Sequence, residues 1–141
     1  MSLQMFCRKN VVKIFPEATI DDACELMEKH QVGSIVAESD GKLCGILTDR
    51  DIALKVTGRQ KDPRMTKVAE IMTADPIRIT VNKDLQQLTH LIHAYHVRRI
   101  PIVDGFDRTL GIVTLDDVIA LIASEMSEVG KAIAEEFLEN P

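Results

Sequence analysis

One internal repeat limits the fold of this chain more than any other feature. When the sequence is shifted by 65 positions, residues 12–14 (VKI) align with residues 77–79 (IRI), and later apolar positions keep matching. Beyond the next turn the shift is 66, and residues 45–51 (GILTDRD) align with residues 111–117 (GIVTLDD). An insertion inside a turn leaves the elements on either side in register. The sequence therefore predicts two copies of one structural unit.

Each copy shows the same order of hydrophobic patterns. A short strand is followed by a helix, two aliphatic strands around an Asp-Gly turn, and a helix that begins after a threonine. The predicted strands are 11–15, 34–37 and 43–47, then 77–81, 100–103 and 110–113, and the predicted leading helices are 20–30 and 85–95. A β-α-β-β-α unit of about 55 residues buries too little surface to be stable alone. The predicted fold class is α/β (α+β), with two repeats packed pseudo-symmetrically.

The repeat divides the chain into three parts. The first repeat is expected at residues 8–62 and the second at 63–123, with an exposed linker at 57–67. Residues 124–141 form a tail. Four of its apolar residues recur at steps of 3, 4 and 4, namely Met126, Val129, Ile133 and Phe137. This spacing predicts an acidic, amphipathic C-terminal helix, weakened by Gly130, whose apolar stripe requires a partner.

Charge and hydropathy argue against two classes of partner. The formal net charge is -5, and residues 124–141 alone contain five Glu and one Lys, so the body is nearly neutral. Duplex DNA or RNA binding needs a basic face that this sequence does not supply. No apolar run approaches the roughly 20 residues that span a bilayer, and we find no secretion signal. We therefore expect a cytoplasmic protein without nucleic-acid or membrane partners, whose Cys7, Cys24 and Cys44 stay reduced.

The residues that close each copy, with two further segments, resemble a known family. Both copies end in Gly-aliphatic-x-Thr-x-x-Asp, residues 68–72 read VAEIM, and residues 97–104 read VRRIPIVD. Together these motifs are similar to the tandem CBS domain pair, or Bateman module, over residues 11–123. The resemblance implies a regulatory or sensor protein, not an enzyme, that binds AMP, ADP, ATP or S-adenosylmethionine between its repeats and requires no other cofactor. It also implies a homodimer, a disc of two pairs, and leaves room for an unknown protein target.

The threonine and aspartate of each copy have two interpretations. Thr48 with Asp51, and Thr114 with Asp117, have the spacing of a capping box, which satisfies N–H groups at a helix start. A helix N-terminus also attracts anions. The resemblance implies that Asp51 and Asp117 accept hydrogen bonds from ribose hydroxyls, and that Thr48 and Thr114 face the ribose or phosphate. Capping with empty clefts and ligand binding both remain open, and the two roles are compatible.

The two copies differ most at the end of the leading helix. Arg98 and Arg99 of the second copy stand where the first has Gly33 and Ser34. An arginine presents several donors to phosphate oxygens, and the resemblance implies such a role here. Two arginines at a helix C-terminus also favour the negative end of the helix dipole, which is an alternative reason for their presence.

The remaining predicted contacts surround the base. Pro101 predicts an irregular or edge strand, and the resemblance implies that it walls the base, with further adenine contacts around Thr73, Arg78 and Lys13. The VAEIM segment is predicted to have no counterpart in residues 1–10 (MSLQMFCRKN). One nucleotide cleft is therefore expected to be competent and the other degenerate.

Other functions receive little support from the sequence. His90, His93 and His96 lie at spacings that one helix face can share, but no cysteine or carboxylate set accompanies them, so no metal site is predicted. No phosphate-binding glycine motif or catalytic triad spacing is present. The leading hypothesis is a ligand-responsive binding module. Its rival is a structural or interaction protein with empty clefts, which acts through dimerisation and its C-terminal helix.

Overall fold

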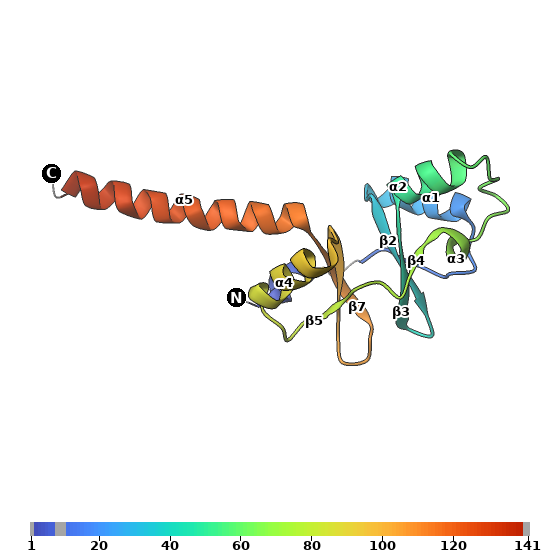
Figure 1. The fold of residues 1–141 in the computed structure, drawn as a ribbon, viewed down its shortest axis with the longest axis horizontal. Coiled ribbons are helices and arrows are strands. Elements are labelled where there is room, and N and C mark those ends of the chain that lie inside the picture. The colour runs from blue at the N-terminus through green and yellow to red at the C-terminus, as the bar shows by residue number, and fades with distance from the viewer. Residues whose placement is uncertain (1, 8–10, 140–141) are drawn as a thin grey trace.

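The fold consists of two small mixed sheets that share one three-strand arrangement, to which the first sheet adds a fourth strand (Figure 1). The computed structural model describes residues 2–7 and 11–139. The first sheet has the order β1-β2-β3-β4 and the second β5-β6-β7. The strands are β1 (Lys13–Ile14), β2 (Ser34–Ser39), β3 (Lys42–Thr48), β4 (Thr73–Ala74), β5 (Ile79–Thr80), β6 (Arg99–Val103) and β7 (Thr109–Thr114). The helical segments are η1 (Leu3–Phe6), α1 (Ile20–His30), α2 (Asp49–Asp51), η2 (Ile52–Thr57), α3 (Val68–Ile71), α4 (Leu85–Tyr95) and α5 (Leu115–Glu139).

Strand pairing confirms the predicted repeat. In each copy the short first strand pairs in parallel with the second, β1 with β2 and β5 with β6. The second strand then pairs antiparallel with the third, β2 with β3 and β6 with β7. The predicted fold class is correct, although the first strand of each copy has two residues in place of the predicted five.

The leading helices α1 and α4 have the predicted bounds because both carry strong end signals. Thr19 and Asp22 form a complete capping box on α1, and Asp84 and Gln87 form one on α4. Both helices end at a residue in the left-handed region, Gln31 in the first copy and its counterpart His96 in the second. Their apolar faces lie in separate cores. Buried members include Ile20, Ala23 and Met27 of α1 and Leu88 of α4.

The two hairpin turns reverse the chain with different residues in the left-handed region. Asp40 and Gly41 both have positive φ, 53° and 74°, as a two-residue type I′ turn requires. In the longer second turn it is Asp107, at φ 64°, that enters the left-handed region, while the Asp104 carboxylate accepts hydrogen bonds from the N–H groups of Phe106 and Arg108. Both turns join antiparallel strands, as predicted.

The prediction that the VAEIM segment has no counterpart is wrong. VAEIM begins α3, whose Val68 and Ile71 enter the core of the first repeat. Residues 2–7 form η1 and enter the core of the second repeat through Leu3, which is fully buried, and Phe6. Leu3, Phe6 and Cys7 precede Val68, Ile71 and Met72 by the repeat shift of 65.

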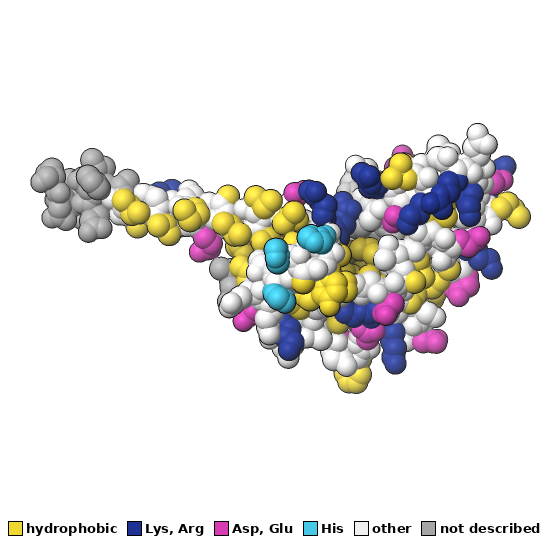
Figure 2. Space-filling model, in the orientation of Figure 1, with side chains coloured by type: hydrophobic (Ala, Val, Ile, Leu, Met, Phe, Trp, Pro, Cys, Tyr) yellow, Lys and Arg dark blue, Asp and Glu magenta, His cyan; other side chains and the backbone are white. Residues whose placement is uncertain are grey.

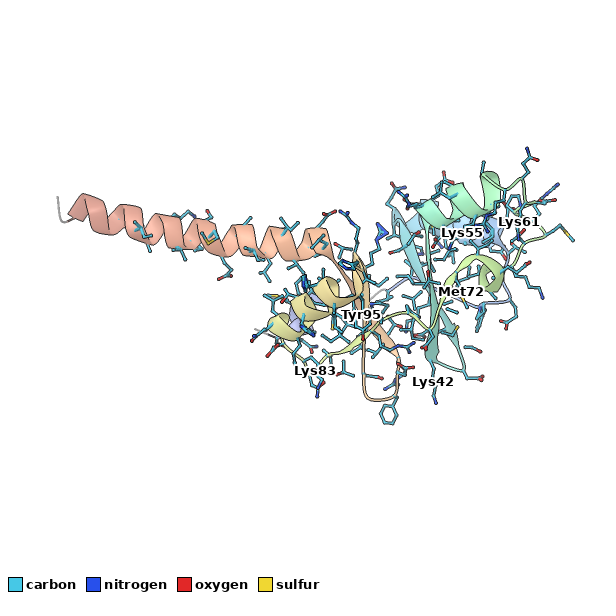
Figure 3. The ribbon with its side chains drawn as sticks, in the orientation of Figure 1. Lys42, Lys55, Lys61, Met72, Lys83 and Tyr95 are labelled. Atoms are coloured by element: carbon cyan, nitrogen blue, oxygen red, sulfur yellow. The ribbon has the colours of Figure 1, made fainter. Side chains whose placement is uncertain are left out.

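Each lead-in segment thus packs on the other repeat. Ala74, after α3, pairs with Gly45 of β3, and a Cβ on Gly45 would lie 2.2 Å from the Met72 sulfur. Figure 3 shows Met72 beside the strands of the first repeat. Cys7 bridges Gly111 of β7 in the same way, and a Cβ on Gly111 would lie 2.5 Å from the Phe6 carbonyl oxygen. Both glycines of the repeated motif are therefore explained by close approach of a lead-in.

Two further predictions need correction. Pro101 lies in β6, the central strand of its sheet, so the edge alternative is wrong, whereas the irregular alternative agrees with the register shift between Ile102 and Val103. Proline is tolerated there because β5 pairs with β6 only from Ile79 and Ile102 onward. The helix after Thr114 and the predicted tail helix are one continuous helix, α5, of 25 residues, which projects away from both sheets (Figure 1). The side chain of Phe137 lies outside the described residues, and the boundaries at 62/63 and 123/124 remain predictions.

The two repeats share a small third core and several polar links. Val36 and Leu43 of the first repeat pack with Val103 of the second. The Glu38 carboxylate accepts a hydrogen bond from the Thr109 N–H at 2.8 Å and pairs with Lys13 at 3.2 Å. These contacts hold the copies against each other, as their small individual cores require.

Two remaining features concern thiols and membranes. Cys7, Cys24 and Cys44 are free and half-buried, and burial raises the pKa of each thiol above its ordinary value. Thiols with raised pKa stay protonated at neutral pH and are poor nucleophiles. Among the described residues, no helix combines the length and hydrophobicity needed to cross a bilayer.

Candidate functional site

Two clefts lie where the repeats meet. The larger has a volume of about 600 Å³ and the smaller about 260 Å³. The larger cleft is lined by Ile46, Thr48, Asp49, Arg50, Thr73, Asp75, Pro76, Ile77, Val97, Arg98, Arg99, Thr114, Leu115 and Asp116. The smaller cleft is lined by Val11, Val12, Gln31, Val32, Gly33, Ser34, Arg99, Ile112, Thr114 and Asp117. Since Arg99 and Thr114 line both, the clefts adjoin.

The clefts are related by the internal repeat. Each combines the threonine motif of one copy with the entry strand and the end of the leading helix from the other copy. Thr48 thus meets Arg98 and Arg99 in the larger cleft, whereas Thr114 and Asp117 meet Gly33 and Ser34 in the smaller. Three of the predicted site residues, Arg99, Thr114 and Asp117, lie together in the lining of the smaller cleft.

Both threonine–aspartate pairs form the predicted capping boxes. The Asp51 N–H donates to the Thr48 hydroxyl oxygen at 3.1 Å, and the Thr48 N–H donates to the Asp51 carboxylate at 3.0 Å. The corresponding distances are 3.0 and 2.9 Å for Thr114 and Asp117. In each aspartate the cap uses Oδ2, so Oδ1 is the carboxylate oxygen that remains to accept a hydrogen bond from a ligand or another side chain.

That second oxygen has different neighbours in the two copies. The Lys55 ammonium pairs with Oδ1 of Asp51 at 3.1 Å and also donates to the Ile71 carbonyl oxygen. Figure 3 shows Lys55 on the helical segment of the first repeat. The position that corresponds to Lys55 in the second copy is Leu121. Among the described residues, no lysine or arginine forms an ion pair with Asp117, whose carboxylate lines the smaller cleft.

The larger cleft carries both signs of charge. Arg98 is exposed, Arg99 is half-buried, and Arg50 is a third guanidinium on its wall. Sequence reasoning missed Arg50, although its place inside the repeated threonine motif, TDRD in the first copy and TLDD in the second, was a usable signal. The cleft also holds the carboxylates of Asp49, Asp75 and Asp116, which offset the charge of the three arginines.

The remaining predicted residues are divided between clefts and structural contacts. Thr73 lines the larger cleft. Lys13 is paired with Glu38 and lines neither cleft. Arg78 binds the Asp107 carboxylate at 2.6 Å and the Asp75 carboxylate, and it donates to the Leu43 carbonyl oxygen, so it links the repeats. Asp51 is not among the residues that line the larger cleft.

Pro101 affects the cleft because proline has no N–H to donate a strand hydrogen bond. In the first copy the Val36 N–H donates to the Val12 carbonyl oxygen at 3.1 Å. Pro101 occupies the position of Val36 and has no N–H, so it cannot donate to Ile77, the counterpart of Val12. Ile77 lines the larger cleft. The Ile77 carbonyl oxygen therefore receives no strand hydrogen bond from position 101, and it lies beside the cleft as an acceptor.

Another groove lies away from both clefts. A groove of about 750 Å³ runs between α4, β5 and the turn that ends at Asp107, and it is walled by the second repeat alone. Of the predicted site residues it contains only Arg78, whose charge is already paired. Volume alone therefore does not identify the functional site.

His90, His93 and His96 lie exposed on and just after α4 (Figure 2), and the described residues contain no cluster of three metal-ligating side chains.

Comparison with known proteins identifies the family. The family model for the CBS domain matches residues 3–58 and again 68–124. The chain is 39% identical over 108 residues to the CBS domain-containing protein YhcV of Bacillus subtilis, covering 77% of this chain and 76% of YhcV. It is 30% identical over 112 residues to inosine-5'-monophosphate dehydrogenase of Methanocaldococcus jannaschii, covering 79% of this chain but only 21% of that enzyme.

A solved structure agrees. The CBS domain pair of protein MJ0100, in complex with 5'-methylthioadenosine and S-adenosyl-L-methionine, superposes with a TM-score of 0.78 at 25% identity, covering 89% of this chain and 98% of that one. The two matches of the family model fall on the two copies, and each begins at the lead-in segment that packs on the other copy. The chain belongs to the CBS domain family, as a tandem pair.

Proposed function

We propose that this protein is a regulatory module that binds an adenosine-containing nucleotide between its two repeats, with the ribose on Asp117. The supporting observation is that Asp117, Thr114 and Arg99 line one cleft although they come from different elements. The similar pair from MJ0100 holds 5'-methylthioadenosine and S-adenosyl-L-methionine, which are both adenosine derivatives. The ligand class assigned here is accordingly AMP, ADP, ATP or S-adenosylmethionine.

The chemistry of the smaller cleft fits a ribose and a phosphate. A carboxylate accepts hydrogen bonds from two vicinal hydroxyls, and Asp117 has one oxygen beyond the one used by its cap. Arg99 supplies guanidinium donors suited to phosphate oxygens. Both lie at or near the N-terminus of α5, a long helix whose dipole favours an anion at that end.

The larger cleft is proposed as a second, different site. Thr48, Thr73 and Arg98 line it, together with Arg50. Asp51, the predicted ribose acceptor of the first copy, does not line this cleft and is engaged by Lys55, so binding here depends on the arginines and on apolar contact with Ile46 and Ile77. The Ile77 carbonyl, which Pro101 leaves without a strand donor, suits the exocyclic amine of adenine. The roles of Lys13 and Arg78 are proposed to be structural, through their ion pairs.

The wider proposal follows the family. The module acts without catalysis, associates as a homodimer through its repeats, resides in the cytoplasm, and passes the ligand signal to a protein target. A ligand shifts such a module only if it binds two arrangements with unequal affinity. A nucleotide that contacts both repeats at once meets this condition, because its affinity changes with their separation.

Calorimetric titration tests the proposal directly. AMP, ADP, ATP, NAD and S-adenosylmethionine are titrated into the full chain, with deoxyadenosine monophosphate as the matched control for the ribose contact. Binding of at least one ribonucleotide, with weaker binding of its deoxy form, is the expected result. Absence of both heat and a thermal shift for every ligand at millimolar concentration would show that the clefts are empty.

One observation favours the rival, a structural or interaction module. The two capping boxes are complete without a ligand, so the repeated motif has a sufficient structural reason. Under this rival the protein acts through dimerisation and α5. Deletion of residues 125–141 tests the part played by α5. If the deletion changes oligomer size and leaves nucleotide affinity unchanged, α5 is an assembly element and the clefts bind independently of it.

A further inference from the structure

Helix α5 carries a line of exposed apolar side chains beyond the second repeat. Its members are Ile119, Ile122, Met126, Val129 and Ile133, with exposed fractions of 54, 48, 64, 52 and 55%. We call this set the α5 seam. Because α5 projects away from both sheets, its distal part has no neighbour elsewhere in the part of the chain that the structure describes (Figures 1 and 2). Five large apolar side chains in a line on one helix are more than scattered surface hydrophobicity explains.

The spacing of the seam identifies the kind of surface that covers it. Successive members are separated by 3, 4, 3 and 4 residues, which is the heptad repeat of a coiled coil. A helix that packs on a sheet or globular core carries a broader apolar face. Here the positions that flank the seam include Ala123, Gly130 and Ala132, which are small and allow another helix to approach closely. The seam therefore fits a second helix.

The charges beside the seam are compatible with an identical helix in parallel orientation. In a parallel pair, Glu125 lies beside the seam and faces the position five residues later on its partner, which is Gly130. Glu128 and Lys131 lie on the opposite side of the helix and pair with each other at 3.2 Å. Between Ile119 and Ile133 an in-register copy therefore brings no like charges together, and each apolar residue meets its own equivalent; the next position at this spacing is Glu136, which ends the seam.

We infer that α5 helices from separate copies of this chain pack together along the α5 seam in parallel. The β-branched residues at both kinds of inward position, Ile119 and Ile133 in one and Ile122 and Val129 in the other, favour a bundle over a single pair. The seam extends over little more than two heptads, so the association depends on protein concentration. This interface is separate from the clefts, and it does not require a nucleotide.

Sedimentation equilibrium of the full chain without nucleotide tests this inference over a range of concentrations. Met126→Glu with Val129→Glu places two charges in the seam, where both side chains are solvent-exposed and the fold of one copy does not depend on them. Ser124→Glu with Ser127→Glu adds the same charge to the other side of α5 and serves as the matched control. The seam variant should lower the weight-average mass by about half or more, while the control leaves it unchanged.

Two results overturn the inference. One is a full-length chain with the mass of a single copy at every concentration. The other is an assembly whose mass is the same in the seam variant, the control and the unsubstituted chain, which would mean that the repeats alone associate. Circular dichroism at matched concentrations provides a second readout, because helix content should rise with association only if α5 is the contacting element.

Discussion

At the scale of single residues, Asp51 and Asp117 share one motif and one cap but differ in their neighbours. Lys55 neutralises the free oxygen of Asp51, whereas the aliphatic Leu121 replaces that lysine in the second copy. A carboxylate that already has an ammonium partner gains less from a ligand hydroxyl than one without such a partner. The two aspartates therefore provide a matched pair for separating a capping role from a binding role.

Asp117→Asn should weaken nucleotide binding without unfolding the chain. Asparagine keeps an oxygen that can accept the Thr114 N–H, so the cap survives, but the charged acceptor for ribose is lost. A hydrogen bond to a charged group contributes about 1.5–3 kcal/mol, so the dissociation constant should rise by roughly 10- to 100-fold. Calorimetric titration provides the measurement.

Asp51→Asn is the control for that experiment, because it alters the same cap in the other repeat. A smaller effect on the tightest site is expected for Asp51→Asn than for Asp117→Asn. Equal losses for the two variants, or none for Asp117→Asn, would contradict the assignment of the ribose to Asp117.

At the scale of elements, the helices were predictable and the lead-in segments were not. Capping residues and apolar spacing predict helices α1 and α4, so their bounds follow from the local sequence. Segment η1 is a single short helical turn without periodicity. Its Leu3 and Phe6 pack in the core of the second repeat, which is distant in sequence, so no local pattern reveals their role. The missed signal was the 65-residue shift, which continues backward from Val68 to Leu3.

The residues that line each cleft could not be predicted either, because they come from segments that are distant in the sequence. The sequence places Thr114 near Arg98 and Arg99 along the chain, but the tertiary arrangement brings Asp117 to the helix end of the first copy. Local patterns specify the cap, whereas only the packing of one repeat on the other decides which threonine faces which helix end. The edge alternative for Pro101 fails for lack of the same information, because β5 is too short to need a donor at that position.

Removal of the Leu3 side chain should destabilise the protein as a core substitution does. Leu3 is fully buried among Leu88, Ile100 and Val113, so Leu3→Ala should cost about 2–5 kcal/mol of unfolding free energy. Met5, in the same turn, is 53% exposed, and Met5→Ala should change the unfolding free energy by no more than about 0.5 kcal/mol. Urea denaturation measures both. Equal stabilities of the two variants would mean that η1 is not part of the core.

At the scale of the whole molecule, a ligand in either cleft should stabilise both repeats at once. Each cleft is walled by both copies, so unfolding or separation of either copy destroys the binding site. A ligand at 100 times its dissociation constant adds about 2.7 kcal/mol. The thermal midpoint should therefore rise by roughly 5–15 °C in a single transition. Two transitions, of which only one moves with ligand, would show that the repeats are not coupled through the clefts.

The link between the repeats through Glu38 can be divided into its ionic and hydrogen-bonded parts. Glu38→Gln removes the ion pair with the partly exposed Lys13 but keeps an acceptor for the Thr109 N–H, so it should cost no more than about 1 kcal/mol. Glu38→Ala removes both, and because Thr109 is buried its N–H loses its partner out of reach of water, which adds about 1–3 kcal/mol. Chemical denaturation of the two variants and the unsubstituted chain measures the difference. Equal stability of the Gln and Ala variants would mean that the bond from Thr109 contributes nothing, and the junction would then depend on the apolar contacts of Val36, Leu43 and Val103.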